Sequence, residues 1–102
     1  MINPQMIKKL QKMQEDMKKA QEEINNAIFY GQAGGSIVKV AVKGTKEVVS
    51  IDIKKEEIDL SDFDILQDMI VVALNDAFKK VDKEVEETMG SLTQGMRMPG
   101  MF

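Results

Sequence analysis

Lysines and carboxylates are the side chains with which this sequence could do chemistry, because histidine and cysteine are both absent. Without them there is no thiol nucleophile, no serine–histidine relay, no imidazole base and no His or Cys metal site. Acidic side chains cluster at Asp59, Asp62 and Asp64 and again at Glu84, Glu86 and Glu87. Both clusters fall in polar stretches, so we interpret them as a helix first turn and a solvated helix face. We expect no catalytic residue, no metal site and no cofactor.

The lysines could instead contact phosphate groups. Three of them, Lys8, Lys9 and Lys12, have few acidic neighbours, whereas Lys18 and Lys19 are spaced for i,i+4 ion pairs with glutamates. A second basic cluster lies within an acidic stretch and consists of Lys79, Lys80 and Lys83. From the sequence alone, these lysines could either contact nucleic acid or form a solvated helix face. There is no aromatic platform for single strands and no recognition-helix pattern.

Length and charge narrow the class of protein. The chain has 102 residues, which is room for one domain, and 43% hydrophobic residues, which is ordinary for a globular protein. Its net charge is −3, so binding to nucleic acid needs a local basic patch. No apolar run approaches the roughly 20 residues that span a bilayer, and the N-terminus has no signal-peptide pattern. We expect a soluble cytoplasmic protein that contacts no membrane.

The first 26 residues predict a long helix. Asn3 can cap it, and Pro4 suits the first helical position, where no amide hydrogen is needed. Apolar residues then recur at alternating spacings of four and three, as in a coiled-coil seam: Met6, Leu10, Met13, Met17, Ala20 and Ile24. At about 1.5 Å per residue, such a helix is as long as a compact domain of this size is wide.

Three short strands are predicted next, over residues 28–30, 36–43 and 47–53. In the second strand Val38, Val40 and Val42 alternate with polar or small residues, which indicates one buried face; the third alternates in the same way, with Val49, Ile51 and Ile53 on one face. The glycine-rich run at residues 31–35 lacks the Lys-Ser/Thr ending of a phosphate loop, so we interpret it as a turn.

A second long helix is predicted from Ser61, which can cap it, to Gly90, which can end it. Leu60 can pack against Ile65 at its start. Its apolar face narrows from Val81 and Val85 onward. We therefore expect one domain over residues 1–90 and a flexible, methionine-rich tail over residues 91–102.

The elements predict an α+β fold of order α-β-β-β-α, with a small antiparallel sheet and two long projecting helices. A three-stranded sheet covers only part of each helix, so much apolar surface would face water in a single chain. We infer a two-fold homodimer. Its seam is predicted to consist of Met6, Leu10, Met13, Met17, Ala20, Ile24, Val81 and Val85.

Several runs of the sequence are familiar in their order and spacing. They are KLQKMQEDM at residues 9–17, QEEI at 21–24, GQAGG at 31–35, VKV at 38–40, Gly44, VVSIDI at 48–53, LNDA at 74–77, KK at 79–80 and MRMPG at 96–100. Together they resemble the YbaB/EbfC family of bacterial nucleoid-associated proteins. The resemblance implies a tweezer-like homodimer that binds DNA with limited sequence preference and acts in nucleoid organisation or expression control.

The hypothesis that follows is a non-enzymatic, nucleoid-associated protein that binds double-stranded DNA through backbone phosphates. The lysines of both copies would make these contacts at the tips of the projecting helices: Lys8, Lys9, Lys12, Lys79, Lys80 and Lys83. No small-molecule substrate is expected. The alternative is a coiled-coil adaptor or chaperone-like protein that grips a protein partner between the same helices.

Overall fold

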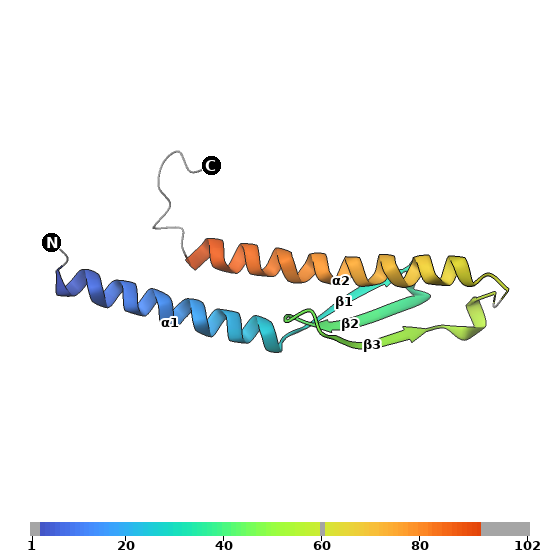
Figure 1. The fold of residues 1–102 in the computed structure, drawn as a ribbon, viewed down its shortest axis with the longest axis horizontal. Helices are drawn as coiled ribbons and strands as arrows, with labels where there is room; N and C mark the ends of the chain where they lie inside the picture. The colour runs from blue at the N-terminus through green and yellow to red at the C-terminus, as the bar shows by residue number, and fades with distance from the viewer. Residues whose placement is uncertain (1–2, 60, 93–102) are drawn as a thin grey trace, which may run out of the picture.

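The fold is described from a computed structural model, which covers residues 3–59 and 61–92 (Figure 1). The elements, in chain order, are α1 (Pro4–Asn26), β1 (Ile28–Ala33), the 3-10 turn η1 (Gly34–Ser36), β2 (Val38–Lys43), β3 (Val48–Ile53), the 3-10 turn η2 (Lys55–Glu57) and α2 (Phe63–Leu92). The predicted α+β class and α-β-β-β-α order are confirmed.

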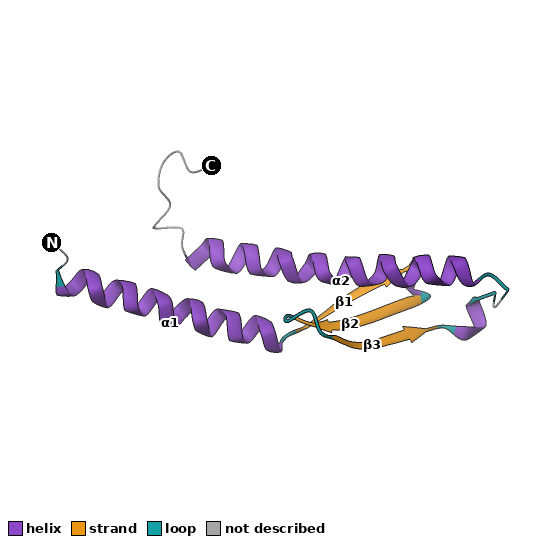
Figure 2. Cartoon of the chain, viewed as in Figure 1, coloured by secondary structure: helices purple, strands orange, loops and turns teal. Residues whose placement is uncertain are grey.

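The molecule is a rod. Its radius of gyration is 19.7 Å and its extents are 70 × 29 × 16 Å, against a radius of about 13 Å for a compact domain of this length. The sheet lies beneath one half of α2, and the other half of α2 runs beside α1 (Figures 1 and 2). The N-terminal part of α1 extends beyond the end of α2 and projects from the rest of the chain.

The first helix begins as its sequence predicts. The Asn3 Oδ1 accepts a hydrogen bond from the Met6 N–H at 2.7 Å, and Pro4 occupies the first turn. The other end of α1 is held against the sheet by the turn between β2 and β3. A Cβ at Gly44 would overlap the Ile24 carbonyl, so only glycine allows the turn to lie this close to α1.

The sheet is antiparallel with strand order β1-β2-β3. The first strand is longer than the predicted residues 28–30, because Gly31, Gln32 and Ala33 pair with β2 instead of turning. The predicted glycine turn is therefore shorter. It is made at Gly34 and Gly35, which have φ values of +63° and +66°, and at Ser36.

Burial differs sharply between the second and third strands. Val38, Val40 and Val42 are at most 2% exposed, which confirms the predicted buried face of β2. The third strand is exposed along most of its length, although Ile51 lies directly opposite Val40. The reason is that α2 packs on β1 and β2 and leaves β3 uncovered. A bulge opposite Ala41 and Val42 also shifts the register of this strand.

Both predicted ends of α2 were wrong. The capping side chain is Asp62, whose Oδ1 accepts from the Ile65 N–H at 3.3 Å; Ser61 is engaged with Asp59. At the other end α2 continues through Gly90 to Leu92. A glycine costs only about 1 kcal/mol in a helix, and Ser91 and Leu92 of this last turn lie across a hollow from Ala20 of α1. Leu60 and residues 93–102 lie outside the described residues, so the predicted staple and tail remain predictions.

Small residues let α2 lie directly on β1. Ala73 and Ala77 are fully buried, one helical turn apart, and Val81 continues the same face. A Cβ at Gly31 of β1 would overlap the Ala73 carbonyl oxygen and lie 2.6 Å from the Ala77 nitrogen. The absence of a side chain at this strand position therefore sets the distance between the helix and the sheet.

The predicted dimer seam divides into two parts. Ile24 and Val81 are 5% and 1% exposed within the single chain, so their burial needs no second copy. Ala20 and Val85 are half-buried in the same chain, as are Met13 and Met17. Met6 and Leu10, on the projecting part of α1, are 54% and 40% exposed. A role of these positions in a dimer stays a prediction.

The contact at Gly31 can be tested by adding one methyl group. We expect Gly31→Ala to lower the free energy of unfolding by about 1–3 kcal/mol, because α2 must move away from β1. Gly35→Ala is the control, since nothing lies within 4 Å of its Cβ position and only its positive φ carries a cost. Urea unfolding followed by circular dichroism measures both; an unchanged midpoint for Gly31→Ala would contradict the packing described.

Candidate nucleic-acid interface

The projecting part of α1 carries the least compensated positive charge. Lys8, Lys9 and Lys12 are exposed and are the only charged side chains between residue 3 and Glu15. Within the described ranges, no salt bridge involves any of them. Ala20 lines an open hollow together with Ser91 and Leu92 of the last α2 turn, and Lys12 lies about 12 Å further along α1 than Ala20, at 1.5 Å per residue. The N-terminal part of α1, which carries these lysines, extends beyond the end of α2 (Figure 1).

The lysines further along α1 are also unpaired. The spacing predicted ion pairs of Lys18 and Lys19 with nearby glutamates, but none of the salt bridges in the described part of the chain includes either residue. The prediction of these pairs was therefore wrong. Long side chains on a solvated helix gain little from such pairing, because holding both of them in one geometry costs conformational entropy.

Lys80 of α2, in contrast, is bonded to other groups within the chain. Its Nζ donates to the backbone carbonyl of Tyr30 at 2.8 Å and lies 3.6 Å from the Asp76 carboxylate. The same carboxylate accepts from the Gln32 N–H at 3.2 Å. Two side chains of α2 therefore satisfy backbone groups on the outer edge of β1. Lys80 has a structural partner that the sequence alone did not reveal.

The other two lysines of the cluster lie among acidic side chains. Lys83 is 4.0 Å from Glu87, and Asp82 pairs with Lys46 at 2.8 Å. Lys79 is exposed and takes part in none of the salt bridges found among the described residues. Of the three predicted α2 contacts, Lys79 is thus the one without a competing ion pair or hydrogen bond.

The structure does not bring the two predicted lysine groups together within one chain. Lys8, Lys9 and Lys12 lie near the free end of α1, whereas residues 79–83 lie in the middle of α2, beside the sheet. The expectation that both groups lie at helix tips is wrong for the second group. Its position follows from the length of α2, which continues well beyond residue 83.

A further basic position lies on the sheet. Lys39 is exposed on β2 and lines a shallow hollow with Tyr30, Gly31, Gln32 and Lys80. Tyr30 itself is 65% exposed. The alternation of β2 placed Lys39 on the solvent face, but its approach to Lys80 depends on how α2 lies across β1. It is the candidate phosphate contact that sequence reasoning did not single out.

The acidic side chains form no evident metal or catalytic cluster. Hydrogen bonds from the Ser61 hydroxyl and the Ser61 N–H lower the pKa of the exposed Asp59, which is a local turn effect. In residues 3–59 and 61–92, no three acidic side chains converge in a way that could hold a metal ion. Neither helix, over its described length, is apolar enough to cross a membrane.

Fold and site together define a class of protein, a two-layer α+β chain with a projecting, lysine-bearing helix. The model of the YbaB/EbfC DNA-binding family matches residues 2–96. This chain belongs to that family, which is a DNA-binding family and not an enzyme family.

Individual relatives match three quarters or more of the chain. A nucleoid-associated protein of Pelotomaculum thermopropionicum is 46% identical over 95% of this chain and 92% of its own length. One from Bacillus licheniformis is 52% identical over 78% of this chain and 75% of its own. Among solved structures, the crystal structure of an uncharacterized protein, HP0035 of Helicobacter pylori, covers 94% of this chain and 98% of its own, with a TM-score of 0.66 and 26% identity.

The different environments of two neighbouring lysines give a stability prediction. We expect Lys80→Met to lower the free energy of unfolding by about 0.5–1 kcal/mol, because the Tyr30 carbonyl loses its donor. Lys79→Met removes the same charge and should stay within about 0.5 kcal/mol of the parent protein. Parallel urea titrations compare the two variants; equal effects would mean that the contact between Lys80 and Tyr30 contributes nothing.

Proposed function

We propose that this protein is a homodimeric nucleoid-associated protein that binds double-stranded DNA through its backbone phosphates, with limited sequence preference. It would act on the nucleoid in the cytoplasm and influence nucleoid organisation and gene expression. The family supports the DNA-binding part. The names of the Pelotomaculum and Bacillus relatives, both nucleoid-associated proteins, support the cellular location.

The observation that carries the proposal is the projecting part of α1. Lys8, Lys9 and Lys12 are exposed, lie beyond the end of α2 and have no salt bridge within the described chain. An unpaired lysine can neutralise a phosphate and release its counterion without first breaking an internal contact. Lys79 is the α2 position best suited to add to these contacts. Lys80 and Lys83 would have to give up interactions that they make within the chain.

Limited sequence preference fits the chemistry of this surface. Lysine is a flexible point charge, and contacts to phosphate carry no direct information about the bases. The exposed face of α1 offers no arginine, because the chain has a single Arg, Arg97, outside the described residues. The bidentate contacts with guanine that arginine commonly makes are therefore not available on this helix.

The test is a gel-shift series over ionic strength with a triple variant, Lys8→Gln, Lys9→Gln and Lys12→Gln. We expect weaker binding to every duplex sequence. With both copies altered, the slope of log K against log salt should fall by up to about 5, at roughly 0.9 for each phosphate that the protein no longer neutralises.

The matched control changes the net charge equally on the sheet half of the molecule, at lysines that are given no role in binding: Lys43→Gln, Lys54→Gln and Lys55→Gln. It should retain most of the affinity and of the salt slope. An unchanged slope for the α1 variant, or an equal loss in the control, would contradict the assignment of the contacts to α1.

A second candidate function has one observation in its favour. Met6, Ile7 and Leu10 form an apolar strip on the same projecting helix and are 54%, 44% and 40% exposed. An adaptor that grips a protein partner would use this strip and would not need the lysines. A nuclease-treated binding assay separates the two functions, because the α1 lysine variant would then keep its partner, whereas Met6→Ser with Leu10→Ser would lose it.

A further inference from the structure

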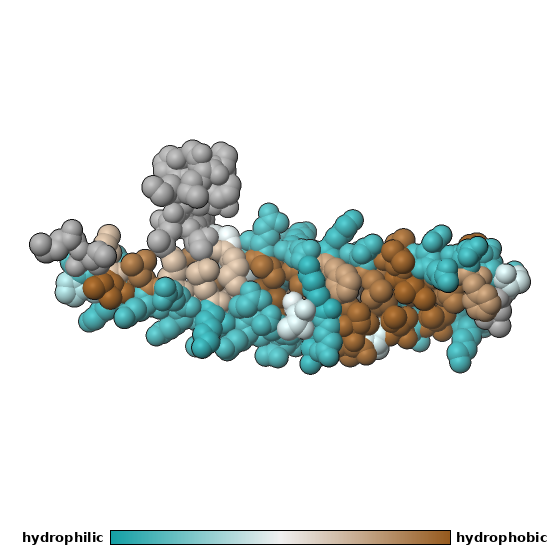
Figure 3. All heavy atoms as spheres, viewed as in Figure 1, coloured by the Kyte–Doolittle hydropathy of each residue, from teal (hydrophilic) through white to brown (hydrophobic). Residues whose placement is uncertain are grey.

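A groove runs between α1 and α2, from the end of α2 to the base of α1. It consists of two open hollows of about 350 Å³ each, which adjoin because both are lined by Ala20, Glu84 and Thr88. Figure 3 shows α1 as mainly hydrophilic, so its apolar contribution to the groove is local. The apolar lining comes from both helices and the start of β1: Ala20, Ile24, Ala27, Ile28, Phe29 and Leu92.

The rim of the groove is acidic. Glu23 of α1 and Glu84 of α2 both line it, and neither takes part in a salt bridge within the described residues. Glu84 accepts a hydrogen bond from the Thr88 hydroxyl at 3.2 Å, and Glu87 lies 4.0 Å from the Lys83 Nζ. Among the described residues, no lysine or arginine lines either hollow. The groove therefore suits an occupant that is apolar and carries a positive charge.

The end of α2 adds to this preference for a cation. The last turn of a helix presents unpaired carbonyl groups and the negative end of the helix dipole. The last turn of α2, which ends at Leu92, contains no basic residue. Ser91 and Leu92 of this turn line the groove, so a positive charge bound there would also compensate the helix end.

The sequence directly after α2 has both of the required properties. Residues 93–102, which read TQGMRMPGMF, lie outside the described residues and contain one charged side chain, Arg97. Arg97 stands between Met96 and Met98. Methionine is unbranched and flexible, so it fills irregular apolar hollows well. In an extended chain, Met96 and Met98 point to one side and Arg97 to the other, which matches an apolar floor beneath an acidic rim.

We propose that residues 93–102 fold back along α2 and occupy this groove in the same chain. Met96 and Met98 then lie on the apolar floor, and Arg97 pairs with Glu84 at the rim. Gly95 provides the freedom to reverse direction after α2. The tail that the sequence predicts to be flexible is thus held between the two helices. This inference requires neither the dimer nor the DNA contacts of the proposed function.

The segment is long enough to fill the groove. Along α2, the distance from Leu92 back to Glu84 is about 12 Å at 1.5 Å per residue. The seven residues that follow Gly95 span up to about 23 Å when extended. A reversal within residues 93–95 therefore leaves enough chain to pass both hollows.

Attachment to α2 favours this segment over other occupants. Ser91 and Leu92 belong to the wall of the groove, and residue 93 follows them directly in the chain. A segment on a short tether has an effective concentration in the millimolar range, so contacts too weak to hold a free peptide are sufficient. The tail of a second copy, or a separate basic peptide, does not have this advantage.

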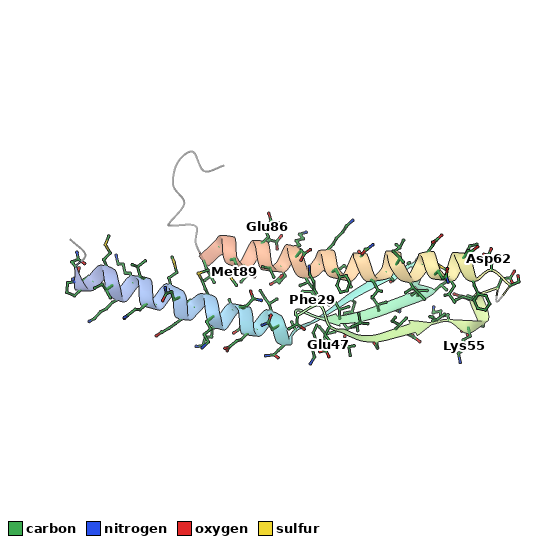
Figure 4. All side chains as sticks on the ribbon, in the orientation of Figure 1. Phe29, Glu47, Lys55, Asp62, Glu86 and Met89 are labelled. Atoms are coloured by element: carbon green, nitrogen blue, oxygen red, sulfur yellow. The ribbon has the colours of Figure 1, made fainter. Side chains whose placement is uncertain are left out.

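The absence of cysteine from the chain allows a direct test with introduced pairs. Thr88→Cys with Met98→Cys places one thiol in the groove and one on the segment. Glu86→Cys with Met98→Cys is the matched control, because Glu86 is exposed on the side of α2 that faces away from α1 (Figure 4). The two loops differ in length by two residues, which changes the cost of closure little.

The measurement is the effective concentration of the intrachain disulfide in a glutathione redox buffer, with circular dichroism to confirm that each variant is folded. We expect a value about tenfold or more higher for the Thr88→Cys pair than for the Glu86→Cys pair. Adding Arg97→Glu to the Thr88→Cys pair should lower its value by about threefold, and Glu84→Arg should restore part of the loss, because the ion pair is then reversed.

Equal effective concentrations for the two cysteine pairs would overturn the proposal, because the segment would then show no preference for the groove. An unchanged value with Arg97→Glu would overturn the assignment of the arginine to the acidic rim. Disulfides that join two chains in dilute solution, seen by non-reducing electrophoresis, would also overturn it, since they place the tail of a second copy in the groove.

Discussion

The packing of α2 on β1 is the contact that determines where every other part of this chain lies. Gly31 has no side chain, and Ala73 and Ala77 have small ones, so the helix rests directly on the strand. A helix in that position covers β1 and β2 and leaves β3 open. It also places Asp76 and Lys80 beside the outer edge of β1, where both bond to the backbone. The protected edge and the open edge of the sheet are therefore two consequences of one contact.

The same helix explains how an acidic chain can have a basic surface. Residues 56–90 carry eleven acidic side chains and three lysines, and two of those lysines, Lys80 and Lys83, have acidic neighbours in the structure. The C-terminal half of α2 packs beside the base of α1 and holds that helix so that it projects. Lys8, Lys9 and Lys12 are thereby carried away from the acidic surface. Screening by salt then lets the local charge at the end of α1 differ in sign from the net charge of −3.

Elements with strong local signals could be predicted, and their boundaries were less certain. Asn3 and Pro4 start α1 as expected, because a cap and a proline act within one turn. The start of α2 was misplaced by one residue, since Ser61 and Asp62 are both good caps and the bonds of Ser61 to Asp59 decide between them. The length of β1 was underestimated, because glycine is normally a turn residue and only the helix above Gly31 gives it a reason to lie in a strand.

The sequence by itself determined the class of fold, the buried face of β2 and the absence of histidine and cysteine chemistry, because these depend on composition and on short-range periodicity. It also located the lysines. Only the tertiary structure decided which lysines are bonded within the chain, since the carbonyl that Lys80 contacts lies 50 residues away in the sequence. It likewise decided that Ile24 and Val81 are buried within one chain and that β3 keeps an open edge. These outcomes depend on how α2 lies across the sheet, and no local pattern of residues specifies that placement.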